Sequence, residues 1–182
     1  MLRIISLATV AIALLAGCET PTTQRYAISA DNNQVIKTLA TSGVGIGQFG
    51  APTDFSSTCR GLGPMQVADN LSHTQYIQKA FEDELKIANA YAAASPPRVV
   101  LTGTVQRLEF SSTRAVTGGS WTIDLALKSS NGSALAVTEY YEFNSGFAAQ
   151  EACRNTAEAF SRAVQNLVGR AVRDPRFPAL VK

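Results

Sequence analysis

Hydrophobic residues recur at helical spacing in two segments of the chain. Over residues 72–91 they lie three or four positions apart, and Ser72-His73-Thr74-Gln75 has the form of a capping box. From Ala149 to Val172 the apolar residues share one helical face. We therefore predict helices over both segments. The second should stop at Asp174-Pro175, because a proline disfavours helix in the residue before it.

Between these helices, apolar and polar residues alternate, which is typical of strands with one buried face. The pattern defines three strand candidates, residues 98–110, 120–129 and 133–143. In the first candidate the apolar positions change phase near Gln106, which predicts a β-bulge there.

The connection between the second and third strands determines which side chains share a face. A two-residue Asn-Gly turn would place the apolar sets on opposite faces of the hairpin. A three-residue loop, Ser130-Asn131-Gly132, instead pairs Leu127 with Leu135 and Trp121 with Tyr141 on one face. We predict the three-residue loop.

The segment before the first helix is rich in glycine and polar residues. Residues 43–50 carry four glycines but lack the Gly-Lys-Ser/Thr ending of a phosphate loop, so they favour a strand with close neighbours. Residues 32–41 predict a short helix capped by Asp31 or Asn32, and Met65–Val67 a short strand. The order of elements predicts an α+β fold, a two-layer sandwich whose antiparallel sheet carries two main helices on one face.

The chain begins with an export signal. Arg3 precedes an apolar run from Ile4 to Leu15, which is too short to span a bilayer and has the form of a secretory signal. The following Leu15-Ala16-Gly17-Cys18 resembles the lipobox of bacterial lipoproteins, which implies diacylglycerol attachment to Cys18. In the sorting scheme of such lipoproteins, a residue other than Asp at position 19, here Glu19, favours the outer membrane. The alternative is a plain secreted protein in which Cys18 is incidental.

These features divide the 182 residues into three parts. We predict a lipoprotein signal peptide over 1–17, a lipidated N-terminus and polar tether over 18–34, and one globular periplasmic domain over 35–182. The length of the last part suits a single hydrophobic core.

The cysteine count predicts one crosslink. With Cys18 lipidated, Cys59 and Cys153 remain, and two thiols in an oxidising compartment have one intramolecular pairing. Their bond would close a loop of about 94 residues. No Cys-x-x-Cys spacing is present, so we interpret the bond as structural.

Charge and titratable residues argue against several functions. The 16 basic and 14 acidic residues are interspersed, which gives no support to nucleic acid as a partner, and one histidine limits metal chemistry. His73 is expected on the helix surface. Strand alternation accounts for Asp124 and Glu142, whereas Glu139 lies on the apolar face and needs a partner, for which Arg107 is available. We therefore expect no enzyme, no catalytic residue, no cofactor and no metal.

Two surfaces could bind other molecules. The polar side of the second helix carries arginines that could meet anionic glycan or lipid headgroups, although a solvated helix face also explains them. They are Arg154, Arg162, Arg170 and Arg173. The outer face of the sheet is small and weakly polar, and we prefer it as a contact surface for a partner or a second copy. Its residues include Ala126, Ala134, Ala136, Thr138 and Tyr140.

The chain resembles small uncharacterised proteobacterial lipoproteins and, more loosely, the YajG type. The resembling residues are Cys59-Arg60, Gly63-Pro64, Tyr76-Ile77, Ala80, Glu84-Leu85, Leu101-Thr102-Gly103, Ser129-Ser130-Asn131-Gly132, Ala152-Cys153, Ala163-Val164-Gln165 and Leu167. The resemblance implies a periplasm-facing lipoprotein with the Cys59 to Cys153 pairing, and it carries no assigned activity.

We therefore expect a non-enzymatic binding or accessory component of the cell envelope, anchored in the outer membrane, with an envelope protein as partner. The alternative is a periplasmic lipid- or glycan-binding module with an apolar cleft between sheet and helices. A hydrolase is the least favoured hypothesis.

Overall fold

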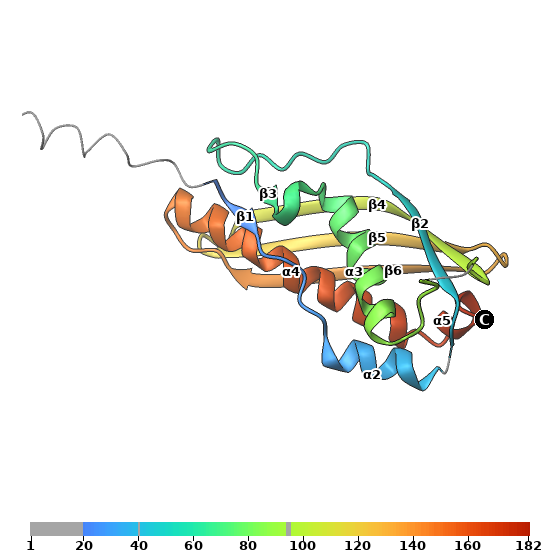
Figure 1. Ribbon diagram of the computed structural model, residues 1–182. Coiled ribbons are helices and arrows are strands. Elements are labelled where there is room, and N and C mark those ends of the chain that lie inside the picture. Colours follow the sequence, from blue (N-terminus) through green and yellow to red (C-terminus); the bar gives the residue numbers. More distant parts are fainter. Residues whose placement is uncertain (1–19, 40, 94–95) are drawn as a thin grey trace, which may run out of the picture.

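A four-stranded sheet carries two long helices on one face (Figure 1). The computed structural model describes residues 20–39, 41–93 and 96–182. The strands of the sheet are β2 (Val44–Gly50), β4 (Val99–Arg114), β5 (Gly118–Ser129) and β6 (Ala134–Asn144), and the long helices are α3 (His73–Ile87) and α4 (Ala149–Arg173). The shorter elements are β1 (Thr22–Thr23), α2 (Ala30–Thr38), β3 (Gln66–Val67), the 3₁₀ helix η2 (Ala68–Asn70) and α5 (Phe177–Leu180). The predicted α+β class is confirmed.

Both long helices begin where the sequence pattern indicated, and α4 also ends there. Helix α3 ends at Ile87, before the predicted Tyr91, because the backbone turns into the left-handed region at Asn89. Ser72 is the N-cap of α3 and forms the predicted capping box with Gln75. Helix α4 ends at Arg173, directly before Asp174-Pro175. Its apolar face packs mainly on β6 and β5.

The hairpin between β5 and β6 has the predicted register. Leu127 lies opposite Leu135, and Trp121 lies opposite Tyr141. The N–H of Ser129 donates to the carbonyl of Ser133 at 2.8 Å, which closes the three-residue loop. The predicted bulge is also present, because the pairing of β4 with β5 shifts register between Val105 and Arg107.

Strand β2 changes the predicted sheet in one respect. The strand order is β2-β4-β5-β6, and β2 pairs with β4 in parallel, so the sheet is mixed rather than antiparallel throughout. The long connection from β2 to β4 contains α3, and such a crossover allows a parallel pair. An added Cβ on Gly47 would come within 2.9 Å of the Thr102 side chain on β4, and one on Gly45 within 2.9 Å of Pro97. The expected close neighbours of the glycine-rich strand are therefore present.

Residues 20–34, predicted as part of a tether, pack against the domain. Strand β1 pairs in parallel with β3, and the buried hydroxyl of Thr23 donates to the carbonyl of Ala157 at 2.9 Å. Helix α2 begins at Ala30 with Ser29 as its N-cap, so the predicted caps Asp31 and Asn32 are wrong. Several polar side chains of this segment, among them Thr23, Tyr26 and Asn32, form hydrogen bonds with the rest of the domain, which polarity alone does not reveal. Residues 18 and 19 lie outside the described residues.

Aromatic side chains fill the layer between the sheet and the helices. Trp121 of β5 is fully buried, and its Nε1 donates to the carbonyl of Thr156 on α4 at 2.8 Å. The ring of Phe160, one turn further along α4, lies 4.7 Å from the Trp121 ring. Burying a side chain of this size contributes roughly 1.5–3 kcal/mol. Trp121 thus joins sheet and helix by both packing and a hydrogen bond.

The predicted bond between Cys59 and Cys153 is present, with its sulfur atoms 2.00 Å apart. It joins the loop before β3 to the second turn of α4. In the part of the chain that the structure describes, no helix is long and apolar enough to cross a membrane.

Replacing both bonded cysteines in the variant Cys59→Ser/Cys153→Ser should lower the free energy of unfolding. The loop-entropy argument sets an upper limit of about 4–5 kcal/mol for a loop of this length. Urea denaturation of wild type and variant measures the difference. Intact mass after alkylation is the control, and two alkylatable thiols in unreduced wild type would contradict the bond.

Candidate functional site

A pocket opens between the loop after β2, the short strand β3 and the first turn of α3. Its volume is about 500 Å³, which is within the range of small-molecule sites. Most of its wall is apolar, with Pro52, Phe55, Met65 and Leu71 among the lining residues. The polar lining includes Ser72, His73 and Thr74 from the start of α3. This pocket lies at the edge of the helix layer, whereas the expected cleft between sheet and helices is filled by core side chains.

His73 is buried beneath this pocket, so the expectation of a surface histidine is wrong. Its side chain packs between the rings of Phe55 and Phe160, with ring centres 4.8 and 4.9 Å away. Only 8% of the residue is exposed, and Nε2 has no hydrogen-bond partner within the described residues. Burial lowers the pKa of His73 to about 4, so the imidazole is neutral at neutral pH. The loop over the start of α3 causes this burial, and a helical pattern does not predict that loop.

A second buried polar group, Glu84 of α3, was missed by the sequence analysis. Its carboxylate is 0% exposed, and Oε1 accepts hydrogen bonds from the Tyr26 hydroxyl and the Ser29 N–H, both at 2.8 Å. Burial raises the pKa of Glu84, and these two hydrogen bonds oppose that shift. Glu84 falls on the same helical stripe as Ile77, Phe81 and Ala88. Its place in this apolar stripe is a signal that could have identified it.

Glu139 finds its partners on α4 and not at Arg107. Its buried carboxylate pairs with the guanidinium of Arg170, and its Oε1 accepts a hydrogen bond from Asn166 at 3.1 Å. Arg107 instead pairs with Asp124 across the sheet at 2.8 Å. Helix α4 packs on β6, which brings Arg170 close to Glu139, whereas Arg107 is two strands away.

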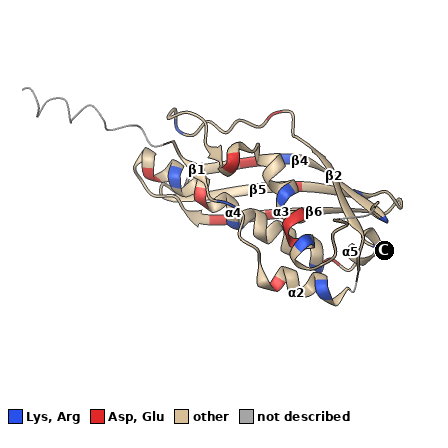
Figure 2. Cartoon of the chain, in the orientation of Figure 1, with Lys and Arg blue, Asp and Glu red and all other residues tan. Residues whose placement is uncertain are grey.

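The arginines of α4 are largely used in contacts within the protein. Besides Arg170, Arg173 donates to the Asn32 side chain at 3.0 Å, and Arg162 donates to Gln165 at 3.0 Å. Arg154 is exposed near the start of the helix. Basic and acidic positions are mixed over the molecule (Figure 2). Arg162, Arg170 and Arg173 each have a partner within the protein, and all three line a polar pocket of about 560 Å³ beside α2.

The sheet face opposite the helices is open in the described structure. It presents small or hydroxyl-bearing side chains together with charged ones. The first group includes Thr102, Thr104, Ala126, Ala134, Ala136, Thr138 and Tyr140, and the charged side chains are Arg107, Glu109, Asp124, Lys128 and Glu142. The edge of β6 away from β5 forms no backbone hydrogen bond with another described segment. By contrast, the edge of β2 is partly occupied, because Val44 exchanges backbone hydrogen bonds with Ala90 and Ala92.

The predicted site residues therefore fall into separate places. Cys59 and Cys153 lie together at one end of the domain, His73 lies under the pocket, and Glu139 lies beneath α4. The predicted lipidation residue Cys18 lies outside the described residues. Across those residues, no group of three or more His, Cys, Asp or Glu side chains is placed to hold a metal ion.

Comparison with solved structures shows that this fold occurs elsewhere. A protein of Xanthomonas campestris assigned to family DUF330 is similar with a TM-score of 0.55 and 14% identity, over 88% of this chain and 95% of that chain. A candidate lipoprotein of Caulobacter crescentus has a TM-score of 0.44 and 12% identity, over 81% and 93% of the two chains. The first similarity shows a shared fold, and the second is too weak to support an inference. The chain matches no protein-family model and no curated protein.

The burial of His73 predicts a loss of stability in acid. Its folded pKa of about 4 lies below its ordinary value of 6.5, so between these values the unfolded chain binds a proton that the folded chain does not. The free energy of unfolding should fall as pH decreases through this window, by up to about 3 kcal/mol in all. The variant His73→Phe keeps a ring among the same aromatic neighbours. Its free energy of unfolding should lose the part of the pH dependence that His73 contributes.

Urea denaturation of both proteins from pH 7 to pH 4 makes the comparison. Glu84, whose folded pKa is raised, stabilises the fold at low pH and loses that contribution as pH rises. Because Glu84 is present in both proteins, the difference between them isolates His73. Equal slopes would contradict the burial of a neutral imidazole.

Proposed function

We propose that this protein is a lipoprotein of the bacterial cell envelope, held on the outer membrane by lipid on Cys18 and facing the periplasm. The observation that carries the proposal is the sequence Leu15-Ala16-Gly17-Cys18 at the end of the export signal. Several acyl chains on one cysteine hold a protein stably on a membrane. The crosslink between Cys59 and Cys153 agrees with an oxidising compartment. The resemblance to uncharacterised proteobacterial lipoproteins, including the YajG type, belongs to this proposal.

The role we propose is binding and not catalysis. Three strand carboxylates are engaged in ion pairs, Asp124 with Arg107, Glu139 with Arg170 and Glu142 with Arg114. His73 is held neutral by burial, and its nearest ring neighbours are aromatic. Such pairing and packing serve stability, since a general acid or base needs access to the reacting group.

An envelope protein is the partner that the open sheet surface fits best. The open face combines small side chains, which allow close approach, with charged ones, which can pair with a partner protein, and the β6 edge has backbone groups available for pairing. An extended segment of another protein can pair with such an edge and read alternate side chains on the face. A lipid or glycan has no regular backbone with which to form this ladder. We therefore favour a protein bound along β6.

The pocket above His73 favours a second candidate function, a module that binds a lipid or glycan. Its volume would hold a small ligand, and its apolar wall suits an acyl chain. A lipid or sugar that copurifies with the protein and is detected by mass spectrometry would support this candidate. Loss of this lipid or sugar from the variant Phe55→Trp, whose larger side chain would fill the pocket, would show that the ligand binds there.

The anchor is tested by the variant Cys18→Ser. We expect it to lose labelling by a radioactive fatty acid and to move from the membrane to the soluble periplasmic fraction, because the thiol that receives the lipid is gone. Thr20→Ser, two positions away, is the matched control and should remain labelled and bound. Glu19→Asp should move the lipidated protein toward the inner membrane. Membrane retention of Cys18→Ser would refute the lipid assignment.

The partner surface is tested by placing an arginine on the open face. Ala136→Arg adds a long charged side chain to β6 and should reduce capture of a crosslinked envelope protein by at least roughly tenfold, the effect of losing about 1.4 kcal/mol of binding. Gln34→Arg adds the same charge at an exposed position of α2 and should leave capture unchanged. Quantitative mass spectrometry of the captured proteins measures both. Equal capture by the two variants would exclude this face.

A further inference from the structure

Three loops meet at the end of the domain where α4 starts, and each presents an exposed apolar side chain. We call this region the α4-start end; it consists of residues 59–63, 113–118 and 144–148. Leu62 is 45% exposed, Val116 is 64% exposed and Phe147 is 76% exposed. Apolar side chains of this size at the tips of three neighbouring loops form a surface that favours an apolar partner.

Hydrogen bonds and the disulfide hold these loops together. The guanidinium of Arg60 donates to the carbonyl of Phe147 at 2.9 Å and also contacts Ser112. The N–H of Ser145 donates to the carbonyl of Thr117 at 2.8 Å. The disulfide attaches the first loop to the second turn of α4. The three apolar side chains therefore project from one connected end of the molecule.

The backbone of Val116 has a strained conformation in its loop. Its φ of 78° lies in the left-handed region, where a β-branched residue is strained. Backbone strain of this kind is concentrated at functional sites. Glycine would relieve the strain but would remove the apolar side chain from the tip of the β4–β5 turn.

The N-terminal chain approaches the domain from this end. Thr23 bonds to Ala157 of α4, and four residues later Ala27 accepts a hydrogen bond from Gln165, so the chain runs along α4 away from the helix start. In the reverse direction it leads toward the α4-start end, as Figure 1 shows for the blue segment at β1. Cys18 is two residues before Thr20 and so lies at most about 7 Å from it along an extended chain.

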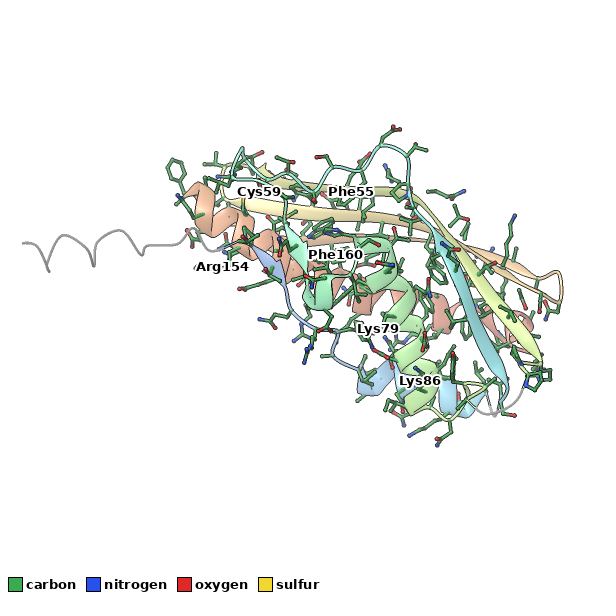
Figure 3. All side chains as sticks on the ribbon, turned by 45° about the horizontal axis from the view of Figure 1, so that its top comes forward. Phe55, Cys59, Lys79, Lys86, Arg154 and Phe160 are labelled. Atoms are coloured by element: carbon green, nitrogen blue, oxygen red, sulfur yellow. A yellow bond between two sulfur atoms is a disulfide. The ribbon has the colours of Figure 1, made fainter. Side chains whose placement is uncertain are left out.

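Charged side chains border the α4-start end. Arg154 and Glu151 are exposed in the first two turns of α4, and Arg60 is held by its hydrogen bonds to Phe147 and Ser112. Figure 3 shows Cys59 and Arg154 at this end, far from Lys86 near the end of α3. An exposed arginine such as Arg154 beside exposed apolar side chains suits the interface of a bilayer that contains anionic lipids.

From these observations we propose that the α4-start end rests on the bilayer surface, with Leu62, Val116 and Phe147 inserted among the lipid headgroups and upper acyl chains. This placement rests on the proposed lipidation of Cys18, whose short link to Thr20 keeps the domain close to the membrane. The long strands β4, β5 and β6 extend away from this end (Figure 1). The open sheet face then stands sideways to the membrane and is accessible to a partner in the periplasm.

The test uses tryptophan emission of the lipidated full chain on vesicles of phosphatidylethanolamine and phosphatidylglycerol whose acyl chains carry bromine. Phe147→Trp adds a tryptophan at the α4-start end, and Ile87→Trp adds one at the 54% exposed end of α3 as a matched control. The buried Trp121 of the wild type supplies the background to subtract. Brominated vesicles should reduce the added emission of Phe147→Trp by at least roughly twofold, and that of Ile87→Trp should not change.

Flotation of the same samples separates the two hypotheses. One outcome is that the wild type floats with the vesicles while the two tryptophan variants are either both quenched or both unchanged. That result would overturn the membrane placement and leave the anchor intact. Wild type that does not float would overturn the anchor and this placement together. Leu62→Ser/Val116→Asn, made in Phe147→Trp, gives a second measurement, since asparagine tolerates the left-handed conformation. It should weaken the quenching without reducing flotation.

Discussion

The packing of α4 on β5 and β6 is the interaction on which the other parts of the structure depend. Its centre is Trp121, which contacts Phe160 and donates a hydrogen bond to the Thr156 carbonyl. Other segments are attached to the same helix at other positions. Thr23 of β1 forms a hydrogen bond with Ala157, and the disulfide joins the loop before β3 to Cys153. If α4 lost its packing on the sheet, the N-terminal segment and the loop before β3, which are attached to α4, would lose their places relative to the sheet as well.

The same packing makes the molecule asymmetric in a way that suits an anchored protein. Both long helices cover one sheet face, which leaves the other face and the β6 edge for a partner. The start of α4 lies at the end from which the N-terminal chain departs. Anchor, membrane contact and partner surface can thus occupy different sides of one small domain, so that binding on one side need not disturb another.

Individual residues show where inference from the sequence reached its limit. The capping box at Ser72, the bulge before Arg107 and the pairing of Leu127 with Leu135 follow from local spacing, and all are present. Glu139 was identified as a buried charge, but its partner Arg170 is 31 residues away and could not be chosen from alternation alone. His73 was predicted on the helix surface, but it is buried because a loop from another part of the chain covers it.

The sequence by itself determined the helices, the hairpin register, the cysteine pairing and the proposed export signal. These depend on periodicity, turn geometry, residue count and short motifs, which act over a few residues or allow one solution. Tertiary structure decided the parallel position of β2, the attachment of residues 20–34, the partners of Glu84 and Glu139, and the apolar α4-start end. Each of these depends on which distant segments become neighbours when the apolar face of α4 is buried, and that choice is made by packing of the whole chain.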